Sequence, residues 1–138
     1  MKTKILILLI SVLSISFLNI QGCASTQKNK TLNIFDERSR LYGRLLRWRE
    51  YEGAVAMIRH QDESSVEVNL EDYKDLRVTN YEIKKVAMGE DLKTAVVEAD
   101  ISYYFETTNA VKQLRDTQSW WYAEEAETWF LDDDLPAF

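Results

Sequence analysis

Side chains suited to nucleophilic or metal chemistry are scarce in this chain of 138 residues, which has one cysteine, Cys23, and one histidine, His60. A transition-metal site needs several histidine or cysteine ligands at fixed spacing, and the sequence offers no second one. His60 follows Arg59 at the predicted end of a helix, where a polar or cationic group stabilises the last carbonyls. We therefore interpret His60 as a capping or exposed residue rather than as a general base.

The other candidate ligands are the carboxylates of Asp132-Asp133-Asp134. Carboxylate oxygens suit a hard cation such as Ca²⁺. Consecutive residues point their side chains in different directions, so a solvated acidic tail is the favoured interpretation. The chain also has no serine in a nucleophile elbow and no glycine-rich phosphate loop. The sequence therefore predicts no metal site, no cofactor and no assigned catalytic residue.

Cys23 stands at the end of an apolar N-terminal run, in the sequence Ile20-Gln21-Gly22-Cys23. Two lysines precede the run of residues 5–18, which has the length of a signal-peptide core and is shorter than the ~20 residues that span a membrane. The arrangement resembles a bacterial lipobox. The resemblance implies a signal peptide of residues 1–22, cleavage between Gly22 and Cys23, and a diacylglyceryl group on the Cys23 sulfur. The alternatives are an ordinary secretory signal or an uncleaved anchor, with Cys23 a bystander.

The residues around the cysteine also suggest a location and a class of partner. By the same resemblance, Ala24 in place of the aspartate that commonly signals inner-membrane retention implies an outer-membrane anchor facing the periplasm. The polar residues 23–32 are predicted to be a lipidated tether of at most ~30 Å. The leader holds two of the 17 Lys+Arg and none of the 23 Asp+Glu, so the chain after residue 22 has a net charge of −8. That charge opposes nucleic acid as a partner, and leaves the membrane, through the lipid on Cys23, an envelope protein or a homodimer.

Residues 33–138 fit a single α+β domain. Helical periodicity predicts a first helix from Asn33 or Asp36 to Glu50, and shorter helical stretches over 51–58 and 70–76. The period then changes to two, which predicts strands over 78–88, 94–107, 110–123 and 127–131. Helices followed by an antiparallel meander predict N-terminal helices packed on one face of a curved, cone-like antiparallel sheet.

The first predicted helix has an apolar stripe and a separate row of arginines. The apolar residues recur at helical spacing, so they should meet the sheet, with Trp48 facing Trp120 across the core. The arginines are predicted to be solvated, and the alternative is contact with an anionic polymer of the envelope. The stripe consists of Leu41, Tyr42, Leu45, Leu46 and Trp48, and the row of Arg40, Arg44 and Arg47.

A long hairpin is predicted around a two-residue turn at Thr108-Asn109. Its paired residues should then have numbers that add up to 217, which places the polar Asp116 and Gln118 on the apolar face. Buried polar groups need partners. Either these two residues line a pocket together with Tyr103, or Asp116 is tied to an arginine or a tyrosine hydroxyl for structure alone. Burial would raise the pKa of Asp116 and a nearby cation would lower it, so its direction is open.

The opposite face of the hairpin carries Tyr104 and Trp121. Aromatic side chains on an outer face could mark an interface with a partner or a second copy. A solvated sheet with scattered aromatic residues is an equally good interpretation.

Several short stretches point to a family. The element order, and Tyr51-Glu52-Gly53-Ala54 after a tryptophan-bearing helix, resemble the nuclear transport factor 2-like, or cystatin-like, cone fold. Three further stretches are similar to a group of uncharacterised bacterial lipoproteins of that fold: Arg77–Glu82, Arg115–Trp120 and Leu135–Phe138. The resemblance implies the fold of about Asn33–Phe138 and an envelope location, and it carries no activity.

The sequence thus predicts a membrane-anchored envelope lipoprotein with a non-enzymatic binding or structural role. One alternative is a small enzyme resembling polyketide cyclases or isomerases, with Asp116 as acid and base. Such enzymes usually have a His–Asp or Tyr–Asp pair in the pocket, which His60 at a helix end would not supply. A third possibility is a carrier of an apolar ligand inside the cone.

Overall fold

The computed structural model describes residues 22–138. The predicted signal peptide, apart from Gly22, lies outside the described residues, and so does the side chain of Cys23. Backbone contacts divide the chain into two units, Met1–Lys30 and Thr31–Phe138. Within the part of the chain that the structure describes, no helix is both long and apolar enough to cross a membrane.

Helix α2 spans Gly22–Arg47 and so begins well before the predicted Asn33. The residues predicted to be a tether are helical here, because they contain no proline or internal glycine and extend an existing helix at little cost. At the other end the helix stops before the predicted Glu50. Arg49 adopts a left-handed φ of 63°, while the backbone N–H of Glu50 donates to Leu45 O at 2.9 Å and that of Arg49 to Leu46 O at 3.3 Å. This pair of hydrogen bonds is a Schellman motif, which terminates a helix.

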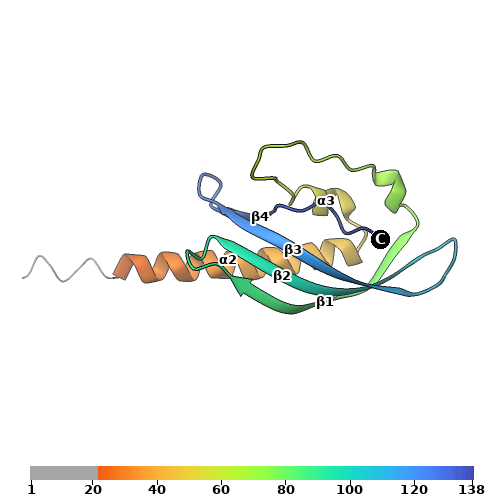
Figure 1. Ribbon diagram of the computed structural model, residues 1–138, viewed down its shortest axis with the longest axis horizontal. Helices are drawn as coiled ribbons and strands as arrows, with labels where there is room; N and C mark the ends of the chain where they lie inside the picture. Colours follow the sequence, from red (N-terminus) through yellow and green to blue (C-terminus); the bar gives the residue numbers. More distant parts are fainter. Residues whose placement is uncertain (1–21) are drawn as a thin grey trace, which may run out of the picture. The chain divides into compact units, whose positions relative to one another are not determined.

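The second unit is α+β, as predicted, with one long helix and a curved, open antiparallel sheet of four strands in the order β1-β2-β3-β4 (Figure 1). The strands are β1 (Leu76–Met88), β2 (Thr94–Phe105), β3 (Lys112–Ala123) and β4 (Thr128–Leu131). Of the other predicted helical stretches, α3 covers only Tyr51–Val55 and a 3₁₀ turn, η1, covers Leu70–Tyr73.

The hairpin between β2 and β3 has a longer loop than predicted, and its register differs by two residues. Asn109 adopts a left-handed φ of 52° and its N–H donates to Phe105 O at 2.8 Å, so the loop covers residues 106–111. Val97 consequently pairs with Gln118, and Ala99 with Asp116, rather than with Trp120 and Gln118. Because side chains alternate with a period of two, a shift of two residues leaves every side chain on its predicted face.

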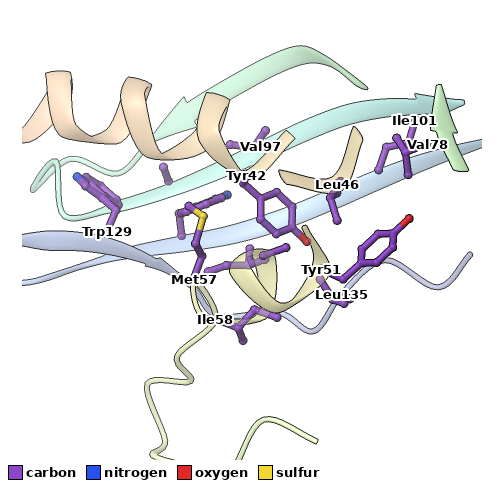
Figure 2. Close-up of a cluster of buried hydrophobic side chains, with 14 of the residues drawn as sticks. Tyr42, Leu46, Tyr51, Met57, Ile58, Val78, Val97, Ile101, Trp129 and Leu135 are labelled. Carbon is purple, nitrogen blue, oxygen red and sulfur yellow. The ribbon is translucent and has the colours of Figure 1, made fainter. Parts of the chain in front are cut away.

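The core lies between α2 and the inner face of the sheet (Figure 2). The helix buries Phe35, Ser39, Tyr42 and Leu46, whereas Trp48 is 73% exposed. The prediction that Trp48 faces Trp120 is therefore wrong. The helix ends at Arg47, so Trp48 does not continue the apolar face that the helix turns to the sheet.

The residues after β4 cover one end of the core. Leu135 is buried, and the ring of Phe138 lies 5.1 Å from Tyr103 and 6.2 Å from Tyr73. The strand itself is secured from the other side, because Leu131 forms a parallel bridge with Ile58. The C-terminal segment is thus part of the fold.

Candidate functional site

The polar residues on the inner face of β3 are organised around the side-chain amide of Gln118. Alternation along β3 turns Asp116, Gln118 and Trp120 to the same face. The Gln118 Nε2 atom donates to Asp116 Oδ2 at 2.6 Å and to the Tyr81 hydroxyl at 2.8 Å. Its Oε1 atom accepts from Trp120 Nε1 at 3.1 Å. Gln118 is 1% exposed, so these contacts satisfy an amide that is cut off from water.

Burial dominates the electrostatics of this cluster. The pKa of Asp116 is raised, chiefly because burial disfavours its charged form, although the hydrogen bond from Gln118 acts in the opposite direction. Burial likewise raises the pKa of the Tyr81 hydroxyl and of Tyr42. Among the described residues, the Tyr42 hydroxyl is the buried side-chain polar group that has no hydrogen-bond partner. The cluster therefore favours uncharged groups.

Tyr103, predicted to join Asp116 and Gln118, lies elsewhere. It pairs with Lys112, four residues along β2 from Ala99, which is opposite Asp116. At ~3.3 Å per residue this separates it from Asp116 by about 13 Å along the sheet. The tyrosine that does join the cluster is Tyr81. The register shift in β1 between Val78 and Asn80 turns Tyr81 inward, whereas simple alternation from Val78 would have placed it outside.

A groove of about 510 Å³ runs between α2 and β1. One wall is a single face of the helix, with Arg40, Arg44 and Arg47, and the other is β1 with Tyr81, Ile83 and Val86. The helix backbone and β1 meet closely at Gly43, where an added Cβ would overlap the Tyr81 ring. The predicted arginine row is thus confirmed as one exposed face of the helix, and it lines this groove. None of Asp116, Gln118 and Tyr103 lines the three grooves described for this part of the chain.

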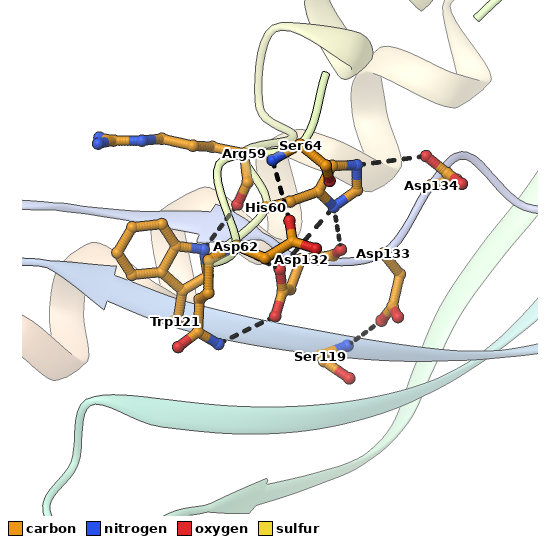
Figure 3. Close-up of polar contacts among 10 residues, drawn as sticks. Arg59, His60, Asp62, Ser64, Ser119, Trp121, Asp132, Asp133 and Asp134 are labelled. Atoms are coloured by element: carbon orange, nitrogen blue, oxygen red, sulfur yellow. Dashed lines mark hydrogen bonds and ion pairs between the residues drawn. The ribbon is translucent and has the colours of Figure 1, made fainter. Parts of the chain in front are cut away.

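His60 lies beside the residues that follow β4 and is mostly buried, with 14% of its side chain exposed (Figure 3). Its Nδ1–H donates to the backbone carbonyl of Asp132, and its Nε2 lies 3.5 Å from Asp134 Oδ1. Asp132 also accepts from Gln61 N at 2.8 Å, and Asp133 accepts from the backbone N–H of Ser119. The prediction of a solvated acidic tail is therefore wrong for Asp132 and Asp133, whose carboxylates hold the segment in place, whereas Asp134 is 72% exposed. Among the described residues, no group of side chains could hold a metal ion.

The two predicted interface residues, Tyr104 and Trp121, lie far apart on the outer face of the sheet. Tyr104 pairs with Arg77 near one end of β2, while Trp121 pairs with Thr94 at the other end. Ten residues of strand, or about 33 Å, lie between these positions. The centre of the face is charged: Arg115 Nε lies 2.8 Å from Asp100, Lys84 lies 2.9 Å from Glu82, and Lys85 lies 3.5 Å from Glu98. Tyr104 and Trp121 therefore do not form one continuous patch.

Trp121 instead belongs to a small cluster at the β4 side of the sheet. Its Nε1 donates to Arg59 O at 2.7 Å, and the Arg59 guanidinium lies 5.4 Å from the centres of both the Trp121 and Phe130 rings. Arg59 also forms an ion pair with Glu125 at 2.7 Å. These contacts give the half-buried tryptophan a structural role.

Comparison of the chain with models of protein families, with curated proteins and with solved structures finds no match.

Proposed function

We propose that this chain is a lipid-anchored lipoprotein of the cell envelope whose α+β domain binds a partner and does not catalyse a reaction. The lipobox-like Ile20-Gln21-Gly22-Cys23 supports the anchor, and Ala24 supports the outer membrane facing the periplasm. The long helix across a curved antiparallel sheet is compatible with a nuclear transport factor 2-like cone, which we retain as part of the proposal.

The observation that carries the binding role is the set of contacts made by Gln118. Its amide is bound by Asp116, Tyr81 and Trp120, so the polar groups on the inner face satisfy one another. An acid/base site needs a free group within reach of a substrate proton. With the inner face engaged in this way, the open grooves of the surface are the better places for a ligand.

Metabolic labelling with an alkyne fatty acid tests the anchor. Wild-type chain should acquire the label and fractionate with the outer membrane, because two or three acyl chains hold a protein stably. Cys23→Ala should remain unlabelled, whereas Ser25→Ala, two residues away, should behave as wild type. Labelling of the Cys23→Ala variant, or its unchanged outer-membrane fractionation, would contradict the lipoprotein assignment.

A second candidate is a small cyclase- or isomerase-like enzyme with Asp116 as acid and base. Its support is the raised pKa of a half-buried carboxyl that shares Gln118 with the Tyr81 hydroxyl. Under this proposal Asp116→Asn abolishes turnover of a small carbonyl substrate while leaving the fold intact. A variant that retains full turnover would remove Asp116 from the chemistry.

A further inference from the structure

We infer that the groove between α2 and β1 binds an extended, acidic segment of a protein partner, which adds to the sheet beside β1. The inference rests on the proposed binding function and names its class of partner. Three independent features carry it: the free edge of β1, the length of the groove, and two arginines that form no ion pair among residues 25–138.

β1 is the open edge of the sheet. It has 13 residues and, in the part of the chain that the structure describes, β2 is its only strand neighbour. The opposite edge, at β4, has four residues and is covered, because Leu131 exchanges hydrogen bonds with Met57 O at 3.0 Å and Arg59 N at 2.9 Å. An uncovered edge presents backbone N–H and C=O groups that an incoming strand can pair with.

The two walls of the groove have similar lengths. On the helix it extends from Phe35 to Arg47, which is about 18 Å at ~1.5 Å per residue. On the strand it extends from Tyr81 to Val86, which is about 16 Å at ~3.3 Å per residue. A segment of about five extended residues would fill this length. The apolar side chains of Ile83 and Val86 give it a surface on which alternate residues can pack.

The charges in the groove favour an acidic segment. Arg40 is already bound to Asp36 at 2.9 Å, and Glu82 to Lys84 at 2.9 Å. For Arg44 and Arg47, no carboxylate lies within ion-pair distance among residues 25–138. Both are exposed, in a chain whose net charge is −6. Arg44 and Arg47 are about 4.5 Å apart along the helix axis, and alternate residues of an extended strand are ~6.6 Å apart. Because arginine side chains are long and flexible, the two could pair with two acidic residues at alternate positions of the bound segment.

The same charges disfavour a second copy of this chain as the occupant. A second β1 would bring its own cations, since the strand carries Arg77, Lys84 and Lys85 against Glu82 alone. The adjacent Lys84 and Lys85 would add to this repulsion between like charges. An acidic strand from another protein does not meet it.

Binding of synthetic peptides to the full chain in detergent tests the inference. The probes are an eight-residue peptide that alternates Glu and Val, its Lys–Val counterpart, and poly-glutamate. The groove variant is Arg44→Gln with Arg47→Gln, and the matched control is Lys74→Gln with Lys112→Gln, which removes two exposed lysines outside the groove. Fluorescence anisotropy measures affinity, and hydrogen exchange locates the bound peptide.

The Glu–Val peptide should bind wild type and control alike, and the groove variant at least ~10-fold more weakly, with exchange slowed at the amides of residues 79–86. The Lys–Val peptide should not bind. Equal affinity for the groove variant, or protection at β4 or on the outer face, overturns the inference. Poly-glutamate binding with no protection of β1 identifies an anion site only, and a peptide-free dimer with β1 protected assigns the edge to a second copy. Either outcome overturns strand addition, and neither affects the fatty-acid labelling that tests the anchor.

Discussion

Tyr42 and Trp120 pack edge to face across the interface between helix and sheet, with ring centroids 5.8 Å apart and planes at 85°. Both side chains are almost completely inaccessible to water. The Trp120 indole N–H is bound to Gln118, whereas the Tyr42 hydroxyl has no partner among the described residues. The same contact therefore combines good aromatic packing with an unsatisfied polar atom.

Removing that hydroxyl should not destabilise the domain. Tyr42→Phe keeps the ring and deletes a buried group whose desolvation costs ~1–3 kcal/mol, so we expect an unchanged or increased free energy of unfolding. Tyr42→Ala removes the ring as well and should cost ~3–5 kcal/mol. Urea denaturation of the two variants measures both values. A loss of more than ~1 kcal/mol in Tyr42→Phe would show that the hydroxyl has a partner, such as a buried water.

The two tryptophans that were expected to face each other should differ sharply in their contributions to stability. Trp48→Ala should change the free energy of unfolding by less than ~0.5 kcal/mol, because Trp48 is 73% exposed. Trp120→Ala should cost ~3–5 kcal/mol, since it leaves a cavity and breaks the hydrogen bond to Gln118. Chemical denaturation of the pair, with wild type alongside, checks this. Similar losses in both variants would contradict the placement of the helix end at Arg47.

Two glycine substitutions provide a matched test of the contact between α2 and β1. Alanine normally stabilises a helix by ~1 kcal/mol relative to glycine. At Gly43 the added Cβ would overlap the Tyr81 ring, so Gly43→Ala should destabilise the domain and release Tyr81 from Gln118. At Gly53 the nearest atom is the flexible Leu45 Cδ2 at 3.1 Å, so Gly53→Ala should be neutral or stabilising. Thermal unfolding measures the ranking, and a stabilising Gly43→Ala would contradict the close packing of Tyr81.

The contributions of Asp116 and Asp100 to the free energy of unfolding should change with pH in opposite directions. Because the folded-state pKa of Asp116 is raised above 3.8, ionisation destabilises the fold as pH rises through and beyond that value. Asp116→Asn should therefore gain stability relative to wild type as pH rises from 3 to 7. The Arg115 hydrogen bond lowers the pKa of Asp100 below 3.8, so Asp100 stabilises the fold at neutral pH and loses this effect as pH falls through its folded pKa.

Denaturation curves of Asp116→Asn and Asp100→Asn at pH 3, 5 and 7 measure these trends. Asp100→Asn should be less stable than wild type at pH 7 and approach it at pH 3, the reverse of the trend for Asp116→Asn. Parallel pH profiles for the two variants would show that burial does not control Asp116.

The sequence was sufficient to predict the fold class and the faces of β2 and β3. The change of period from helical to alternating marks the boundary between helix and sheet, and alternation predicts that Val97, Gln118 and Trp120 face inward even though the register was two residues off. The helix boundaries were less predictable. Residues 25–31 have a polar, tether-like composition and still propagate the helix, and the left-handed Arg49 that ends it has no glycine to signal it.

The site was predicted in part. Asp116 and Gln118 could be found because polar residues on an apolar face need partners. Tyr81 could not, because the register shift between Val78 and Asn80 that turns it inward leaves no mark in the pattern of residue types. The acidic run at Asp132 was misjudged because its partners, His60 and Gln61, lie some 70 residues away in sequence and meet it only in the folded chain.

The attachment of Leu135 and Phe138 to the core has a consequence for the timing of folding. They are among the last of the described residues to leave the ribosome, yet Phe138 packs against Tyr73 and Tyr103, which leave it much earlier. Until they arrive, the apolar end of the sheet stays open to chaperones and proteases. The domain should therefore complete its folding only after these last residues have been synthesised and released.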